Sequence, residues 1–208
     1  MNIAILTSPN QWFESYAEAL SERLGNAPIY KDHHSIDRPH DILFILSYHK
    51  IIEQNYLNKN KHNLVIHESD LPQGKGWAPL FWQILEGKNE IVFSMFEAGD
   101  GADNGDIYLK QKLMLTGYEL NEELRHKQAK LIIEMCVNFV NNYNQFLTPA
   151  KQTGEESFYS KRTAKDSELD INKTIKEQFN LLRIVNNDDY PAFFYIDDKK
   201  YILKIEKI

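Results

Sequence analysis

The first 148 residues alternate short apolar runs with longer segments in which apolar residues recur at helical spacing. Runs bounded by turn residues predict buried strands at residues 2–6, 28–30, 41–46, 64–66, 89–97 and 106–115. Helical spacing predicts helices at residues 12–24, 77–87 and 120–146, with a further helical segment after Ser47-Tyr48. This alternation predicts an α/β fold with a mostly parallel sheet, and the longest helix should cover one of its faces.

The composition changes at Thr148-Pro149, which divides the chain into a main domain, residues 1–148, and a small second unit, residues 149–208. The predicted elements of the second unit are an extended linker at 151–170, a helix at 171–185 and strands at 192–196 and 201–205. The polar linker is expected to wrap back over the main domain. The two strands flank Asp197-Asp198-Lys199, which indicates a β-hairpin.

The composition allows one hydrophobic core and a small appendage, because the chain has 208 residues, of which 42% are hydrophobic and 12% aromatic. The formal net charge of −6, from 24 basic and 30 acidic residues, argues against a general nucleic-acid surface. The start, MNIAIL, has no basic leader, and no stretch approaches the roughly 20 apolar residues of a membrane span. We expect a cytoplasmic protein with no membrane partner.

Several residues that carry chemistry in other proteins are interpreted here as structural. Cys136 lies in an apolar helical pattern and is expected to be a small buried side chain. His33, His34 and His40 lie in a polar segment without a cysteine or carboxylate at a recognisable ligand spacing, so no metal site is predicted. The segment TSPNQWF after the first strand contains no glycine, which excludes a nicotinamide or flavin cofactor held by a GxGxxG turn.

Two polar loops carry the candidate chemistry. The run Leu64–Ile66 leads into His67 and Ser69, and a later strand ends in the acidic, glycine-rich stretch 99–105. Ligands of open α/β sheets bind at the loops beyond the carboxyl ends of the strands. We therefore predict that His67 and Asp103 meet across one crevice.

Both loops contain recognisable signatures. HESDLPQGKGWAP, which begins at His67, resembles the H-x-S-x-L-P-x-x-x-G-x-x-P signature of the folate-dependent formyltransferases. FEAGDGADNGDIY is similar to their second signature, G-x-D-x-G-x-I, with Gly101, Asp103, Gly105 and Ile107 in place. The resemblance covers about residues 1–147. It implies a Rossmann-like, mostly parallel sheet of the formyltransferase type, followed by the small unit of helix and hairpin.

The resemblance implies transfer of a formyl group from 10-formyl-tetrahydrofolate to an amine. This reaction needs a neutral amine, stabilisation of a tetrahedral oxyanion and a proton for the departing folate nitrogen. His67 would handle the protons and Asp103 would fix its tautomer and stabilise the imidazolium, with Asn104 as a third catalytic candidate. The implied folate contacts are Glu97, Ala98, Gly99, Gly101 and Asp103 on one wall and Leu46, Ser47 and Tyr48 on the other.

Val65 departs from the family pattern. The pattern is N-x-H, and its asparagine donates a hydrogen bond to the oxyanion, which valine cannot do. Loss of such a donor costs on the order of 10²- to 10³-fold in rate. Asn63 lies on the same side of the strand but roughly 6–7 Å farther along it. The remaining candidates for this role are Asn104, Ser69 and a protonated His67.

The acceptor that the resemblance favours is the amine of a nucleotide-linked amino sugar for surface polysaccharide synthesis. Methionyl-tRNA is disfavoured because the family member for that substrate carries a large basic C-terminal domain. Glycinamide ribonucleotide is disfavoured because the phosphate-holding glycine loop is absent after the first strand. The tail resembles that of sugar N-formyltransferases at Arg162-Thr163, Asp166-Ser167, Asn180, Arg183 and Pro191-Ala192-Phe193. The candidate substrate contacts are Ser69, Lys75, Gly76, Trp77, Tyr159, Lys161 and Arg162.

Two alternatives and one assembly prediction remain open. The protein could be a binding module of the same fold that lost turnover when valine replaced the asparagine. It could also formylate another small amine, on a peptide or an acyl carrier. The terminal hairpin, with Phe193, Phe194 and Tyr195, leaves an apolar edge that needs cover, which favours a homodimer.

Overall fold

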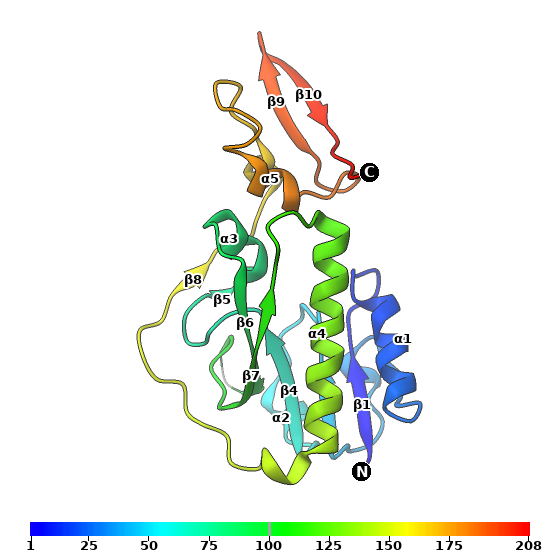
Figure 1. The fold of residues 1–208 in the computed structure, drawn as a ribbon. Helices are drawn as coiled ribbons and strands as arrows, with labels where there is room; N and C mark the ends of the chain where they lie inside the picture. Colours follow the sequence, from blue (N-terminus) through cyan, green and yellow to red (C-terminus); the bar gives the residue numbers. More distant parts are fainter. Residues whose placement is uncertain (100) are drawn as a thin grey trace.

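A mixed sheet forms the centre of the protein (Figure 1). The computed structural model describes residues 1–99 and 101–208. Across these residues the strands of the central sheet follow the order β2-β1-β3-β4-β6-β7. They are β1 (Ile3–Leu6), β2 (Ile29–Tyr30), β3 (Ile42–Ile45), β4 (His62–His67), β6 (Glu90–Glu97) and β7 (Ile107–Met114). The predicted α/β fold and its strand positions are confirmed.

Helices cover both faces of this sheet. They are α1 (Glu14–Arg23), α2 (Gln54–Leu57), α3 (Pro79–Leu85) and α4 (Asn121–Asn141), with short 3-10 turns at His33–Ser35, Tyr143–Gln145 and Ala164–Ser167. Side chains alternate along each strand, so Ile5, Phe44 and Ile66 join the large core with α1 and α4. Ala4 and Leu43 face the other way, onto Leu57 of α2. Cys136 is buried in α4, as its apolar surroundings in the sequence predict.

The direction of β6 corrects one premise of the sequence analysis. The pairs β1–β2, β1–β3 and β3–β4 are parallel, whereas β6 is antiparallel to both β4 and β7. Leu64 pairs with Glu97 and His67 with Ser94. The loop after Glu97 therefore leaves the sheet beside the beginning of β4, at the edge opposite to His67. The two signature loops do not follow strand ends at the same edge.

Residues 150–160 form an extended strap across the main domain, as the sequence analysis predicts. Ala150 pairs with Ile107 through two backbone hydrogen bonds of 2.7 and 2.8 Å. Farther along the strap, β8 (Phe158–Tyr159) pairs in parallel with β5 (Lys75–Gly76). Figure 1 shows this segment passing along the side of the sheet on its way to the C-terminal unit.

The C-terminal unit consists of α5 (Phe179–Ile184) and a hairpin of β9 (Ala192–Ile196) and β10 (Lys199–Leu203). The predicted helix at 171–185 is shorter in the structure, because residues 171–178 form turns instead of helix. Within these turns the side-chain Nε2 of Gln178 donates to the carbonyl oxygen of Asp170. The second strand begins two residues earlier than predicted. Its turn contains only Asp197 and Asp198, both at positive φ, which is the geometry of a tight hairpin.

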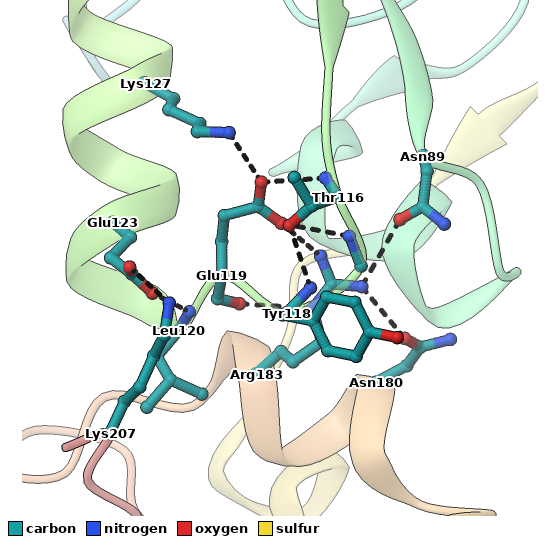
Figure 2. Close-up of polar contacts among 11 residues, drawn as sticks. Asn89, Thr116, Tyr118, Glu119, Leu120, Glu123, Lys127, Asn180, Arg183 and Lys207 are labelled. Carbon is teal, nitrogen blue, oxygen red and sulfur yellow. Dashed lines mark hydrogen bonds and ion pairs between the residues drawn. The ribbon is translucent and has the colours of Figure 1, made fainter.

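A buried ion pair joins this unit to the main domain (Figure 2). Arg183 of α5 and Glu119, which precedes α4, lie 3.2 Å apart, and their side chains are 1% and 4% exposed. Arg183 Nε also donates to the carbonyl oxygen of Glu119 at 3.1 Å. The Glu119 carboxylate accepts from Lys127 Nζ at 2.6 Å and from the backbone N–H of Thr116 at 2.8 Å. The resemblance to sugar N-formyltransferases singled out Arg183, but its role here is to join the two units.

No helix within the described residues combines the length and the apolar character that crossing a membrane requires.

Candidate functional site

His67 stands at the end of β4, where the strand gives way to the first signature loop. Its neighbour Ile66 faces the large core, so alternation directs the imidazole to the other face of the sheet. His67 Nε2 lies 2.8 Å from the carbonyl oxygen of Gly74. Because a carbonyl oxygen only accepts, the proton must sit on Nε2. This hydrogen bond fixes the tautomer and leaves Nδ1 as the atom that can exchange a proton with a ligand.

Asp103 faces that free nitrogen. Its Oδ1 lies 3.7 Å from His67 Nδ1, and the two side chains are 9% and 14% exposed. Its Oδ2 accepts a hydrogen bond from the backbone N–H of Gly76 at 2.9 Å. The distance to the imidazole is too long for a hydrogen bond but suits an ion pair once Nδ1 is protonated. The predicted meeting of His67 and Asp103 is therefore observed, although β6 runs in the opposite direction to the one that the prediction assumed.

The second signature loop reaches His67 by folding back on β6. A Cβ at Gly105 would lie 1.6 Å from the carbonyl oxygen of Glu97, so only glycine allows this approach. Asp103 itself has a φ of +56°, a left-handed conformation that aspartate tolerates better than most residues. The glycine at position 105 thus allows the loop to pack closely against the end of β6.

The strap holds the folded loop in place through Gln152. Gln152 Nε2 donates to the carbonyl oxygens of Asp103 and Gly105 at 2.7 and 2.9 Å. Its Oε1 is buried and has no hydrogen-bond partner among the described residues. Gln152 could not be predicted from the sequence, because a glutamine in a polar linker gives no local signal of its role.

The same strap holds the loop that positions His67. The N–H of Gly74, whose carbonyl binds His67, donates to Ser157 Oγ at 2.8 Å. The N–H groups of Lys75 and Trp77 donate to the carbonyls of Ser157 and Tyr159 at 2.9 and 3.1 Å. Both halves of the candidate site are therefore fastened to one extended segment, which lies beyond the boundary at residue 148.

Lys75, a predicted substrate contact, is directed inwards, and this placement does not support the predicted role. Its side chain is 1% exposed, and its ammonium binds Glu156 Oε1 at 2.6 Å and Asn104 Oδ1. A buried ammonium already held by a carboxylate and an amide is not free to meet an incoming phosphate. Lys75 instead ties the strap to the second signature loop, and it orients the Asn104 amide with the oxygen towards itself.

The other predicted substrate residues lie around α3 and the strap. Trp77 is exposed, and Lys161 Nζ stands 4.9 Å from the centre of its ring. The ring of Tyr159 stacks on Trp82 at 6.2 Å between ring centres and 8° between planes. Arg162 Nη2 donates to the carbonyl oxygen of Asp166 at 3.0 Å. The hydroxyl of the buried Ser69 has no partner among the described residues. The substrate roles of these residues and of Gly76 stay predictions.

A polar groove lies along the same side of β4 as His67. Its cavity of about 460 Å³ is lined by Gln54, Leu57, Asn58, Asn60, Lys61, His62, Asn63, Glu97, Ala98 and Tyr108. Glu97 is held by the N–H of Asn63 at 2.5 Å and the hydroxyl of Tyr108 at 2.8 Å. Burial, reinforced by the charge of Glu97, raises the pKa of Tyr108, so this hydroxyl stays a donor. The side chains of Asn63, Val65 and His67 share one side of the strand, and the groove and the imidazole lie roughly 13 Å apart by strand rise.

The predicted folate-binding residues are only partly described. Glu97 and Ala98 line the groove, and Gly99 and Gly101 follow in the same loop, whose residue Asp100 lies outside the described residues. Of the opposite wall, Leu46 donates its N–H to Leu6, and Ser47 has a φ of +50°. The hydroxyl of Tyr48 lies 2.7 Å from His33 Nδ1, so the side chain is engaged by the neighbouring loop. The folate contacts stay predictions.

The histidine-rich loop has the carboxylate of Asp32 next to His33 and His34. Ligand atoms of Asp32, His33 and His34 lie within 4.8 Å of one another. The Asp32 carboxylate, however, binds Lys50 at 2.5 Å, and the Nδ1 atoms of the two histidines lie 2.7 Å from the hydroxyls of Tyr48 and Tyr56. Contacts within the chain thus account for this cluster.

Comparison with known proteins gives consistent matches. A family model described as formyl transferase matches residues 32–140. The methionyl-tRNA formyltransferase of Ehrlichia ruminantium (strain Gardel) is 30% identical over 162 residues, 77% of this chain and 52% of that protein. The chain thus spans about half the length of the curated relatives that it matches.

Solved structures show the same fold. A methionyl-tRNA formyltransferase from Clostridium thermocellum superposes with a TM-score of 0.83 and 20% identity, covering 100% of this chain and 94% of that one. A sugar N-formyltransferase from Shewanella sp. FDAARGOS_354 gives a TM-score of 0.72 and 13% identity, covering 100% and 99%. The predicted Rossmann-like architecture of the formyltransferase type is confirmed.

Proposed function

Because the chain belongs to the formyl transferase family, we propose that it transfers a formyl group from 10-formyl-tetrahydrofolate to an amine. The observation that carries this proposal is the His67–Asp103 pair, with a fixed tautomer and an ion-pair distance of 3.7 Å. An imidazole titrates near neutral pH and can both accept and donate a proton during one reaction cycle. Neither residue alone would distinguish a catalytic site from an ordinary turn.

In this proposal His67 Nδ1 handles the protons of the reaction. Nε2 is occupied by the Gly74 carbonyl, so Nδ1 is the atom that takes a proton from the incoming amine. Asp103 stabilises the resulting imidazolium across 3.7 Å, and the Nδ1–H then supplies a proton to the departing folate nitrogen. Asp103 in turn is held by the backbone of Gly76.

The groove beside Glu97 is the proposed site of the folate donor. Its volume of about 460 Å³ lies within the range of small-molecule pockets, roughly 300–1,000 Å³. It offers the Glu97 carboxylate and the Tyr108 hydroxyl to a polar ring system. A donor anchored there would extend along β4, past Val65, towards His67.

Val65 leaves this catalytic arrangement without the family's asparagine donor to the oxyanion. Its side chain lies on the strip between the groove and His67 and cannot donate a hydrogen bond. Lys75 engages only the amide oxygen of Asn104, which leaves its Nδ2–H groups as donors, so we assign the stabilisation of the oxyanion to the protonated His67 with Asn104 as the second donor. We expect the protein to be slower than a family member with asparagine at this position, by up to about 10²- to 10³-fold.

The proposed acceptor is the amine of a nucleotide-linked amino sugar. The fold is shared with a sugar N-formyltransferase along 99% of that chain, and the sequence of the tail resembles that of the sugar N-formyltransferases at the residues named in the sequence analysis. Length does not separate the acceptors, because the solved methionyl-tRNA formyltransferase chain is matched over 94% of its length. Methionyl-tRNA is therefore an outcome that the test must include.

The C-terminal hairpin supports a proposed homodimer. Tyr195, Ile196, Tyr201 and Ile202 are 43–61% exposed, which is unusual for so many large apolar side chains in one hairpin. Light scattering on the full chain and on a chain truncated after Asn187 tests this assignment. We expect a dimer that the truncation converts to a monomer. The same oligomeric state in both chains would contradict the assignment.

A transfer assay tests the proposed function. The protein is incubated with isotopically labelled 10-formyl-tetrahydrofolate and with UDP- and dTDP-linked amino sugars or methionyl-tRNA, and the products are identified by mass spectrometry. A formylated sugar supports the proposal, a formylated methionyl-tRNA would replace its acceptor, and no product from any amine would refute transfer.

A binding module without turnover is the second candidate, favoured by Val65 alone. In that case folate analogues would raise the thermal midpoint while Val65→Asn, and not the wild type, would yield product. The two functions are thus separated by the wild-type protein in the same assay.

A further inference from the structure

Arg125, in the second turn of α4, is a cation that the proposed mechanism does not use. Its guanidinium carbon lies 4.5 Å from the centre of the Trp12 ring and 4.4 Å from the centre of the Phe81 ring. Such contacts stabilise a guanidinium and restrict its orientation. Two aromatic side chains from different elements thus hold one positive charge in a fixed place.

This charge is not paired directly with an acid in the described part of the chain. Arg125 Nη1 donates to Gln128 Oε1 at 2.9 Å, and within the described residues no carboxylate lies at ion-pair distance from it. Gln128 Nε2 in turn donates to Glu68 Oε1 at 2.6 Å, so the nearest acid is reached only through an amide. Burial lowers the pKa of Arg125 to about 10, opposed by Glu68, and the group therefore stays charged at neutral pH.

Arg183 shows how this chain treats an arginine that serves structure alone. Arg183 is fully buried, lies 3.2 Å from Glu119 and donates to three further oxygen atoms. A guanidinium has five N–H donors in a rigid fork, and a buried one normally finds acceptors for them. Among the described residues Arg125 uses one of its donors, which leaves the rest of the fork for an external anion.

The position of Arg125 is one where a ligand is expected. Trp12 lies in the turn after β1, and Glu68 follows His67 at the end of β4. The order of the sheet reverses between β1 and β3, because β2 lies outside β1 while β4 lies beyond β3. Ligands of open α/β sheets bind outside the carboxyl ends of the strands at such a reversal. The guanidinium lies on Trp12, in the turn after β1, and is linked through Gln128 to Glu68, the residue that follows His67 at the carboxyl end of β4.

We propose that Arg125 binds a phosphate group of the acceptor while the acceptor amine lies at His67. This inference rests on the proposed function and adds the residue that recognises the charged end of the substrate. A guanidinium fork matches two phosphate oxygens at once, which a lysine ammonium does not. It also supplies the cation that the inward-directed Lys75 does not.

Calorimetric titration of the full chain with UDP, with inorganic pyrophosphate and with uridine tests this site. The variants are Arg125→Gln, Arg125→Lys and, as a matched control, Lys130→Gln, which removes an exposed cation from the same helix. We expect the wild type to bind UDP and pyrophosphate but not uridine. Arg125→Gln should weaken UDP binding by about 10- to 100-fold, as for the loss of a charged hydrogen bond.

The controls separate binding from folding. Arg125→Lys preserves the charge and the apolar stem but not the fork, so we expect it to weaken UDP binding by an intermediate, several-fold amount. Lys130→Gln should change the UDP affinity by less than twofold. Binding of a folate analogue should be unchanged in all three variants, because the groove beside Glu97 does not involve α4. This second ligand shows that each variant is folded.

Two results would overturn the inference. Equal UDP affinity in the wild type, Arg125→Gln and Arg125→Lys would show that this guanidinium does not bind the phosphate. Failure of the wild type to bind either UDP or pyrophosphate would remove the phosphate site itself. If folate analogues still bind and a different amine is still formylated in that case, the proposed transferase function stands without this inference.

Discussion

Replacing Arg183 by methionine should destabilise the protein and loosen the C-terminal unit. The substitution keeps much of the apolar stem but removes the positive charge that lies 3.2 Å from Glu119 (Figure 2). Lys127 and two backbone N–H groups still bind the carboxylate. The remaining negative charge is therefore only partly compensated in a buried place.

The magnitude follows from the burial of both groups. Removing one partner of a buried ion pair costs about 3–5 kcal/mol. Because the Lys127 contact survives, we expect the lower end, about 3 kcal/mol. For a chain of 150–250 residues this corresponds to a decrease in Tm of roughly 6–12 °C.

Glu119 gives the same network a pH dependence. Burial alone would raise the pKa of its carboxyl, but the hydrogen bonds from Lys127 and Thr116 outweigh this and lower it from 4.5 to about 2. A folded-state pKa below the unfolded one stabilises the protein above the unfolded value, and this stabilisation is lost as the pH falls from 4.5 towards 2. At 1.36 kcal/mol per pKa unit the contribution is about 3 kcal/mol.

Urea unfolding, followed by circular dichroism between pH 7 and pH 3, measures both effects. Arg183→Met should lower the midpoint at pH 7, and Glu119→Gln should lose less stability on acidification than the wild type. Lys207→Met is the control, because it breaks only the exposed pair with Glu123 and should cost less than about 1 kcal/mol. A midpoint for Arg183→Met equal to that of Lys207→Met would refute the reasoning.

Three further substitutions test the loops of the candidate site. Gly105→Ala places a methyl group 1.6 Å from the Glu97 carbonyl oxygen, so we expect the loop to shift and folate-analogue binding to weaken at least tenfold by calorimetry; unchanged affinity would show that the loop does not need this close approach. Gln152→Ala removes the donors to the carbonyls of Asp103 and Gly105, so kcat for formyl transfer should fall by about tenfold or more with little change in KM. A lower Tm with unchanged kcat would assign Gln152 to stability alone. Val65→Asn restores the missing donor and should raise kcat by up to about 10²-fold, and a lower rate would contradict the assignment of that position.

Much of the fold was predictable because the apolar runs are short, bounded by turn residues and separated by amphipathic helices. The direction of β6 was not, because a mostly apolar strand of eight residues has the same sequence pattern in a parallel and an antiparallel pairing. The meeting of His67 and Asp103 was therefore predicted from a partly wrong geometry. The signature loops predicted it correctly because their spacing reflects the folded loop rather than the strand direction.

The contacts that hold the candidate site were largely invisible in the sequence. Gln152 lies in a polar linker 49 residues from Asp103, and only the fold shows its donation to the Asp103 carbonyl. Lys75 carries the expected charge, but burial and Glu156 redirect it into the protein. The helical pattern around Arg125 does not indicate that its guanidinium packs on the rings of Trp12 and Phe81. Long-range polar contacts depend on tertiary structure, which local periodicity does not encode.

The most direct test of the account is the rate of formyl transfer in a single turnover, compared among the wild type, His67→Ala and Asp103→Asn. Asp103→Asn is nearly isosteric, so the loop should keep its fold and its hydrogen bond from Gly76. We predict a loss of about 10³-fold or more in each variant, with folate-analogue binding preserved. Transfer in either variant at a rate close to that of the wild type would contradict the claim that this pair carries the reaction.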